Sequence, residues 1–530
     1  MYDLLVKNGR IIDGTGSASY TADVAVAGGE IVAIGKLDGE SAKTIDAAGL
    51  AVSPGFIDLH THSDMSFLLD PKAQSKVRQG VTLELAGNCG MSFCAPLIGE
   101  AEAMLKARVS QYTDSFEVTW KDFGGYLDAL ERAGSTLNIA TQVGHGTVRT
   151  CVIGEADRAP SGDDLEQMKA LIADALDAGA MGFSTGLFYA PGNYARLDEV
   201  IDLASVAAER SKIYSTHMRD EGGRTVGQFV SLNEAIEVGR RTGVRVQSSH
   251  IKCPGAQTWG SAHMVIEVFE RARAEGIDIT ADQYPYSAGA TSLTGILFPR
   301  WSLDGGREAT LERMADPALR KRLHDDLLEA YDMSAGADGV VIARFIPDES
   351  LEGMTMQQIA DSWKCDAADA AIRVYEQAEA MIITHGMREP DIEVFAAHPL
   401  VSVASDGSSL SAEGILSAGK PHPRSYGTNP RFLALYVRER KLVSLEEGVR
   451  KMTLLPATQL GMSRRGRLAP GFAADIVVFD PDTVADTATF ESPHNYAAGI
   501  PHVAVNGTLV VENGEFTGQT PGKVIRGFGD

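Results

Sequence analysis

The sequence predicts an α/β protein: a (β/α)8 TIM-like barrel, a small β-sandwich formed from both chain ends, and an inserted subdomain near the barrel mouth. Three observations predict this fold: a length of 530 residues, strands alternating with helices in the middle of the chain, and hairpin signals at both ends. A typical barrel needs ~250 residues, so there is room for an additional domain. We expect the sandwich to comprise residues 1–53 and 466–530, and the barrel domain residues 54–465.

Both chain ends consist of short apolar strands separated by turn pairs. Near the N-terminus these pairs are Asn8-Gly9 and Gly28-Gly29, and near the C-terminus the pair is Asn506-Gly507. Asn-Gly and Gly-Gly between apolar strands are hairpin signals. Because each end alone has too few strands for a stable core, we expect the two ends to pack together as one small β-sandwich.

The middle of the chain alternates strands with helices, such as 163–178 and 232–242, which predicts a parallel sheet with helical crossovers. Between about 297 and 374 this alternation breaks, and a mostly helical stretch predicts the inserted subdomain. Nine candidate strands compete for eight barrel positions, and we expect the one at 381–384 to lie outside the barrel. The nine candidates cover residues 52–59, 81–86, 137–140, 181–184, 213–216, 244–247, 277–280, 381–384 and 401–405.

Composition and charge exclude several classes of function. A formal net charge of −23 argues against nucleic acid or an anionic membrane as a partner. The N-terminal residues lack the pattern of a secretory signal, and no apolar run reaches the ~20 residues that span a bilayer. The five cysteines form an odd, sparse set, which indicates a reducing compartment. We therefore expect a cytoplasmic protein. A homo-oligomer is compatible with the sequence, which does not fix the oligomeric state.

The apolar run 55–59 ends in two histidines, His60 and His62, one residue apart. Side chains two residues apart on a strand point the same way, so both imidazoles face a common point. Two neutral imidazoles at this spacing make half of a metal site. An isolated pair is more often a polar strand end, and the metal interpretation is favoured here because further ligand candidates follow later strands.

Four further ligand or base candidates, Cys89, His217, His250 and Asp406, each follow a predicted strand. In barrels of this kind the functional residues occupy the C-terminal ends of the strands, so these side chains should converge with the two histidines. Thiolate is a good zinc ligand, and the glycines of the segment 87–90 let the backbone around Cys89 approach an ion. The sequence therefore predicts a metal site at the barrel mouth.

Several motifs resemble those of a known family. The segments 54–62 (PGFIDLHTH) and 466–475 (GRLAPGFAAD) resemble the amidohydrolase superfamily, and the resemblance covers nearly the whole chain. Within that superfamily, four motifs are similar to those of the N-acyl-D-amino-acid deacylases, or D-aminoacylases. These are Gly87–Gly90 (GNCG), Ser248–Lys252 (SSHIK), Tyr284–Tyr286 (YPY) and Pro421–Arg424 (PHPR).

This resemblance implies zinc-dependent hydrolysis of the amide bond of N-acyl-D-amino acids, with the N-acyl amino acid as the small-molecule partner. It implies a tightly bound Zn²⁺ held by Cys89, His217 and His250. It also implies a second, weaker metal position at His60 and His62, with Cys89 bridging. Zinc lowers the pKa of its water to roughly 7 and polarises the amide carbonyl.

The resemblance also implies roles for side chains around the metal. Asp406 is the catalytic carboxylate, which takes the proton of the water and later gives it to the departing amine. Lys252 and Tyr284 hold the α-carboxylate of the substrate, and Phe188 lines its side-chain pocket. Ala290 replaces a serine that assists this carboxylate contact in the family.

Two alternatives remain open from the sequence. One is a cyclic-amide hydrolase of the dihydropyrimidinase or hydantoinase kind on the same scaffold. It is disfavoured because the region 178–189 lacks the lysine that bridges two metals in many superfamily members. The other is a non-catalytic scaffold protein that has kept the fold. The preference for D over L substrates follows from the resemblance alone, and the sequence does not indicate the preferred side chain or acyl group.

Overall fold

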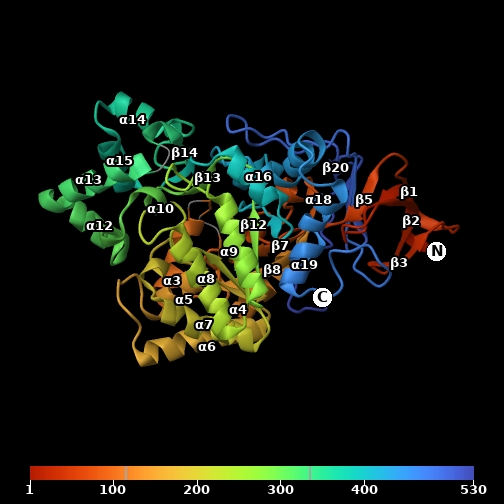
Figure 1. The fold of residues 1–530 in the computed structure, drawn as a ribbon, viewed down its shortest axis with the longest axis horizontal. Helices are drawn as coiled ribbons and strands as arrows, with labels where there is room; N and C mark the ends of the chain where they lie inside the picture. The colour runs from red at the N-terminus through yellow and green to blue at the C-terminus, as the bar shows by residue number, and fades with distance from the viewer. Residues whose placement is uncertain (111, 114–115, 334–335) are drawn as a thin grey trace.

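The structure, a computed structural model, describes residues 1–110, 112–113, 116–333 and 336–530. The named strands of these residues form three sheets of eight, nine and three strands. In Figure 1 the barrel and its helices occupy the lower centre, the first strands lie at the right, and helices α12 to α15 project at the upper left. In the described parts of the chain, no helix has the length and apolar character needed to cross a bilayer.

The eight-stranded sheet is a nearly closed parallel barrel, as predicted. Its last and first strands meet through two backbone hydrogen bonds, in which the Asp406 amide donates to the His60 carbonyl (2.9 Å) and the His62 amide to the Gly407 carbonyl (2.8 Å). In order around the sheet the strands are β6 (Phe56–Asp58), β7 (Val81–Ala86), β8 (Asn138–Gly144), β9 (Gly182–Gly186), β10 (Ile213–His217), β11 (Arg245–Ser248), β12 (Ile279–Gln283) and β16 (Val401–Val403).

Helices cover the barrel and bury the main hydrophobic core against it. Their start signals are local: Ser161 and Asp164 form a reciprocal capping box at the beginning of α6, which satisfies amides that have no partner within the helix. These helices are α3 (Glu100–Val109), α4 (Phe123–Ala133), α5 (His145–Val152), α6 (Gly162–Ala178), α7 (Leu197–Glu209), α8 (Gln228–Thr242), α9 (Ala262–Ala274), α16 (Glu389–Ala397), α17 (Arg424–Arg431), α18 (Leu445–Met452) and α19 (Leu454–Leu460).

The single strand expected over 52–59 is wrong, because the chain changes sheets at Gly55. Strand β5 (Ala51–Pro54) pairs with strands of the nine-stranded sheet, whereas β6 pairs with β7 in the barrel. A Cβ atom at Gly55 would lie 2.1 Å from the Thr82 hydroxyl. Glycine is therefore required where the chain passes from one sheet to the other.

Strands from both chain ends join in the nine-stranded sheet. The hairpins expected at Gly28-Gly29 and Asn506-Gly507 are present, but the prediction of a hairpin at Asn8-Gly9 is wrong. There β1 continues through a bulge, with Asn8 at φ 59° and its amide donating to Asp23 (2.8 Å). Besides β5, the strands are β1 (Tyr2–Ile11), β2 (Tyr20–Ala27), β3 (Glu30–Gly35), β4 (Ser41–Asp46), β17 (Ile476–Phe479), β18 (His502–Val505), β19 (Thr508–Glu512) and β20 (Glu515–Phe516).

A separate hydrophobic cluster, with residues from Leu293 to Ile382, lies in the segment where the strand–helix alternation breaks. The strand at 381–384 lies outside the barrel, as predicted: it is β15, the middle strand of the antiparallel three-stranded sheet. The elements are α10 (Leu293–Leu297), α11 (Arg300–Leu303), α12 (Gly306–Ala315), α13 (Pro317–Met333), α14 (Met356–Trp363), α15 (Ala367–Gln377), β13 (Gly289–Ser292), β14 (Val340–Arg344) and β15 (Met381–Thr384).

Candidate metal centre and active site

The six predicted metal ligands and bases lie at or just after the C-terminal ends of barrel strands: His60, His62, Cys89, His217, His250 and Asp406. Three of them adopt a strained backbone conformation. Cys89, His250 and Asp406 have φ angles of 54°, 34° and 51°. Residues other than glycine seldom have positive φ, and those that do cost about 1–3 kcal/mol and cluster at functional sites. Strain at these three positions indicates that the fold sacrifices local stability to direct these side chains into the barrel mouth.

The glycines beside Cys89 let its loop pack tightly onto neighbouring strands. Gly87 and Gly90 both have positive φ. A Cβ atom at Gly87 would lie 2.1 Å from the Gln142 carbonyl oxygen, and one at Gly90 would lie 2.6 Å from the Gly186 amide nitrogen. The backbone on each side of the thiol is therefore fixed by contacts that larger side chains would prevent.

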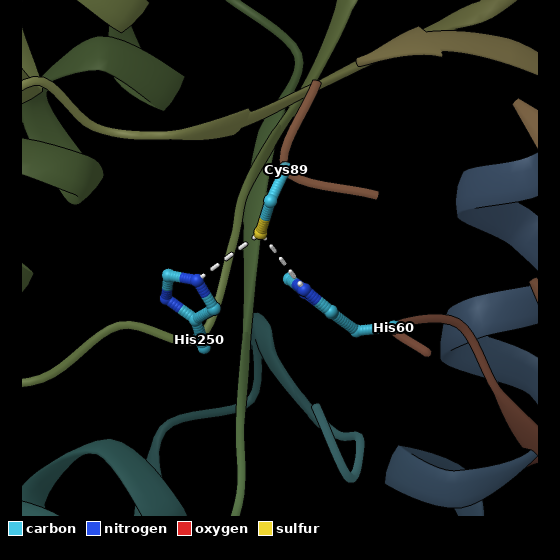
Figure 2. A group of neighbouring side chains, drawn as sticks. All are labelled: His60, Cys89 and His250. Carbon is cyan, nitrogen blue, oxygen red and sulfur yellow. Dashed lines mark hydrogen bonds between the residues drawn. The ribbon is translucent and has the colours of Figure 1, made fainter. Parts of the chain in front are cut away.

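The Cys89 thiol lies between two imidazoles (Figure 2). Its Sγ is 3.4 Å from His60 Nε2 and 3.4 Å from His250 Nε2, and all three residues are buried. Burial opposes ionisation of the thiol, but the two imidazoles outweigh it and hold the pKa of Cys89 well below its usual range. This shift favours the thiolate, which is the form in which cysteine binds a metal.

His217 completes this group from the neighbouring strand. Its Nδ1 lies 3.0 Å from His250 Nε2, the same nitrogen that contacts Cys89. The Phe188 ring stacks on the His217 imidazole with centroids 4.9 Å apart, which fixes the plane of the imidazole. His250 thus contacts both of the other residues expected to hold zinc: its Nε2 lies 3.4 Å from Cys89 Sγ and 3.0 Å from His217 Nδ1.

A buried carboxylate that the sequence analysis missed, Glu221, lies behind the two imidazoles. Its oxygens are 3.2 Å from His217 Nε2 and 3.2 Å from His250 Nδ1, and one of them accepts from Lys252 Nζ at 2.7 Å. Burial opposes its charge, but Lys252 and the imidazoles outweigh burial and hold the pKa of Glu221 well below normal. Its position four residues after His217 is the signal that could have found it.

The ammonium group of Lys252 is held by the protein itself. Besides Glu221, it contacts His250 Nδ1 (2.6 Å) and donates to the His250 carbonyl (2.9 Å). Burial lowers the pKa of Lys252, but the charge of Glu221 outweighs burial, so the pKa of Lys252 is raised overall. The expected anchor for the substrate carboxylate is therefore a fixed cation next to the proposed zinc ligands.

Asp406 faces the centre from β16. Its Oδ1 lies 3.1 Å from His62 Nε2 and 3.4 Å from His60 Nε2, and its Oδ2 accepts from Arg424 at 2.8 Å. Burial opposes its charge, but Arg424 outweighs burial and, with the imidazoles, holds the pKa of Asp406 well below normal. Arg424, which the sequence analysis noted only within a motif, also lies over the ring of buried Tyr284, 4.8 Å from its centroid.

The residues present fit a metal centre. Thiolate, imidazole and carboxylate are the donors that zinc uses in proteins. Three groups at the mouth have donor atoms within 4.8 Å of one another: His60, Cys89 and His250; His60, His62 and Asp406; and His217, Glu221 and His250. Two groups share His60 and two share His250, so this arrangement can accommodate more than one ion.

Comparisons with known proteins show the family to which the chain belongs. The amidohydrolase family profile matches residues 43–327 and 416–511. The chain is 37% identical to an N-acyl-D-glutamate deacylase from Alcaligenes xylosoxydans xylosoxydans over 526 residues, which are 99% of this chain and 96% of that one. The chain therefore belongs to the amidohydrolase family.

Solved structures narrow the assignment within the family. The N-acyl-D-glutamate deacylase from Bordetella bronchiseptica, complexed with zinc and a phosphonate inhibitor, has a TM-score of 0.84 and 35% identity, with 99% of this chain and 100% of that chain covered. A D-aminoacylase structure described as having a binuclear metal centre has a TM-score of 0.84, 36% identity and the same coverage. The resemblance to the N-acyl-D-amino-acid deacylases is thus confirmed. A D-hydantoinase from Thermus sp., with 16% identity and a TM-score of 0.58, shares the fold alone.

Proposed function

We propose that this protein is a zinc-dependent amidohydrolase that cleaves the amide bond of N-acyl-D-amino acids, releasing a carboxylic acid and a D-amino acid. The observation that carries the proposal is the Cys89 thiolate between His60 and His250, with Asp406 beside them at the barrel mouth. Full-length relatives that are deacylases of N-acyl-D-amino acids support the same reaction.

Cys89, His217 and His250 would hold one tightly bound zinc ion, and His60 and His62, with Cys89 bridging, a second and weaker one. When bound, zinc lowers the pKa of a water molecule to roughly 7 and polarises the amide carbonyl. The convergence of Cys89 and His217 on the same nitrogen of His250 supports the first position. The contacts of His60 with Cys89 and Asp406 support the second.

Asp406 would move the proton. It stays ionised because Arg424 and the imidazoles hold its pKa well below normal, so it can accept a proton from the attacking water. It then passes that proton to the departing amine nitrogen. Proton transfer by a positioned group contributes about 10²–10⁴-fold to the rate. The hydrogen bond from Arg424 fixes the orientation of the carboxylate for both steps.

Lys252 and Tyr284 would bind the α-carboxylate of the substrate, and Phe188 would contact its side chain. Lys252 supplies a charge that Glu221 and the His250 carbonyl hold in place. Tyr284 follows β12 and is buried beside Arg424. Phe188 stacks on His217, so a side chain in contact with Phe188 would lie next to the metal centre.

We also propose a division of the chain into a small β-sandwich domain (residues 1–53 and 466–530) and a catalytic domain (54–465) with a subdomain inserted near 297–374. The separate hydrophobic cluster between Leu293 and Ile382 supports the insertion. The five cysteines are free thiols, which agrees with a cytoplasmic location. A homo-oligomer is compatible with these observations.

An assay panel tests the reaction. It compares N-acetyl-D-amino acids with acidic, aromatic and aliphatic side chains against their L-enantiomers, hydantoins and dihydrouracil. The proposal requires turnover of D substrates only. Turnover of the cyclic amides alone would establish the hydantoinase-like alternative. A protein that binds no zinc and turns over none of these compounds would be a scaffold.

A further inference from the structure

An apolar pocket opens beside Cys89. It lies between helices α3 and α5, of which α5 directly follows β8, and the segments that follow β7 and β9. Apart from the Cys89 thiolate, no described residue in its lining carries a charge, and the volume of this open pocket is about 50 Å³. Its larger side chains are Met91, Phe93, Met104, Tyr189 and Pro191.

The order of the barrel strands places this pocket opposite the polar half of the site. In the ring β6, β7, β8, β9, β10, β11, β12 and β16, strand β7 lies opposite β11, β8 opposite β12, and β9 opposite β16. The pocket follows the first member of each pair, whereas Lys252, Tyr284 and Asp406 follow the second. The pocket and the charged groups therefore face each other across the mouth, with Cys89 and the imidazoles between them.

The chemistry of the substrate gives a direction across the mouth. Asp406 must deliver its proton to the amide nitrogen, so the nitrogen, with the α-carbon and the carboxylate, faces the β11–β12–β16 side. The carbonyl carbon, with the acyl chain, then faces the opposite side. An uncharged pocket there cannot compensate the desolvation of a charged group, but it can bury methylene groups.

We propose, on the basis of the function proposed above, that this pocket receives the acyl group and selects an unbranched apolar chain of about four to six carbons over acetyl. One water needs about 10–15 Å³ of such space, so a pocket of about 50 Å³ holds about four groups of that size. A butyryl to hexanoyl tail fills it, whereas acetyl leaves most of it empty. The methionines of the wall adapt to a flexible chain.

A series of N-acyl-D-amino acids with one amino acid and unbranched acyl chains of two to eight carbons tests the inference. We expect kcat/KM to rise about tenfold from acetyl to butyryl, since each buried methylene contributes to binding, and to fall for chains longer than the pocket. The N-succinyl substrate, which has four carbons and a terminal carboxylate, should be cleaved at least tenfold more slowly than the N-butyryl substrate.

Two substitutions in α3 change the pocket without touching the catalytic groups, and a third is their control. Ala101→Leu fills the pocket, because Ala101 is buried and lines it, and should abolish the preference for butyryl while acetyl turnover stays within a factor of about two. Met104→Ala enlarges the pocket and should shift the optimum to longer chains. Ala103→Leu places the same added atoms on the exposed face of the helix and should leave the profile unchanged.

The two proposals fail in distinguishable ways. If acetyl and longer substrates are cleaved at equal rates by the wild type, Ala101→Leu and Met104→Ala, the pocket does not bind the acyl group, whereas the deacylase function stands. If no N-acyl-D-amino acid is cleaved at any chain length by the zinc-loaded protein, the proposed function itself is wrong, and the inference falls with it.

Discussion

Two regions of the molecule gather histidine and carboxylate side chains closely enough to hold a metal ion, and they differ in burial and in backbone strain. One is the barrel mouth around Cys89. The other is a cluster of His324, Asp366 and Asp369 in the inserted segment, whose donor atoms also lie within 4.8 Å of one another. Proximity of ligand types alone therefore does not distinguish a metal centre from an ordinary surface.

Local structure accounts for the cluster in the inserted segment. Asp366 is the N-cap of α15 and accepts a hydrogen bond from the Asp369 amide at 2.9 Å, and His324 lies 2.8 Å from the exposed Asp366 carboxylate. These contacts are a helix cap and a surface pair, so the hydrogen-bonding groups of the cluster already have partners within the protein. At the barrel mouth, by contrast, three residues are strained, and Cys89 and three of the four imidazoles are buried. Burial and strain, which cost stability, identify the functional cluster.

The largest difference between the two clusters is expected when the thiolate is removed. Cys89→Ala should lose zinc and reduce activity to background, since the proposed tight site loses a ligand, whereas Cys365→Ala, beside the other cluster, should change neither. Elemental analysis and an N-acyl-D-amino acid assay on the same samples measure both effects. A fully active Cys89→Ala variant would show that the centre lies elsewhere.

Asp406→Asn should separate chemistry from metal binding. The amide keeps the shape of the side chain but cannot accept a proton, so kcat should fall about 10²–10⁴-fold with the tightly bound zinc retained. Steady-state kinetics and metal analysis check the two parts. Wild-type turnover by this variant would rule out the acid–base role.

Glu221→Gln tests whether the buried carboxylate positions the ligands. Loss of a partner behind metal-bound histidines costs about 10–100-fold in metal affinity, so zinc should bind that much more weakly in a chelator competition. Glu234→Gln, at a carboxylate paired with Arg219, is the matched control and should leave zinc affinity unchanged. Equal affinities in the wild type and Glu221→Gln would make the Glu221 contacts incidental.

Lys252→Met should act on substrate binding. Loss of one charge-assisted contact should raise KM about tenfold for N-acyl-D-amino acids, while KM for the corresponding α-amides, which lack the carboxylate, should stay the same. Initial-rate kinetics on the two substrate series make the comparison. The same rise in KM for both series would assign Lys252 to orienting Glu221 and His250 instead.

The smallest effect is expected in the inserted segment. His324→Ala removes an exposed pair, so stability should change by no more than about 0.5 kcal/mol, and zinc content and activity should be those of the wild type. Denaturant unfolding, together with the assays above, tests this. A loss of zinc from this variant would show that the second cluster is a metal site, and that burial and strain do not distinguish the two clusters.

The sequence was sufficient for features that depend on local pattern. Strand ends carrying His60, Cys89 and Asp406 could be located because apolar runs end there, and the glycines around Cys89 indicated a close backbone approach. The sequence was insufficient where the place of a residue depends on a partner that is distant in the chain. Arg424 lies in the site because of the distant side chains that it meets, and no local pattern contains those contacts, whereas Glu221 could have been found from its position four residues after His217.

The same limit explains the errors in the fold. Asn8-Gly9 has the composition of a hairpin turn. However, β2 pairs with the residues of β1 that precede this position and with those that follow it, so the chain forms a bulge there instead of a turn. The run 52–59 looks like one strand because most of its residues are apolar, and both of its halves are indeed buried. They are buried in different sheets, which only the strand pairing reveals.

The most direct test of the account is the zinc content of exhaustively dialysed protein, measured in parallel for the wild type, Cys89→Ala and His324→Ala. We expect about one tightly held zinc ion per chain in the wild type and in His324→Ala, and none in Cys89→Ala. Retention of zinc by Cys89→Ala together with its loss from His324→Ala would contradict it.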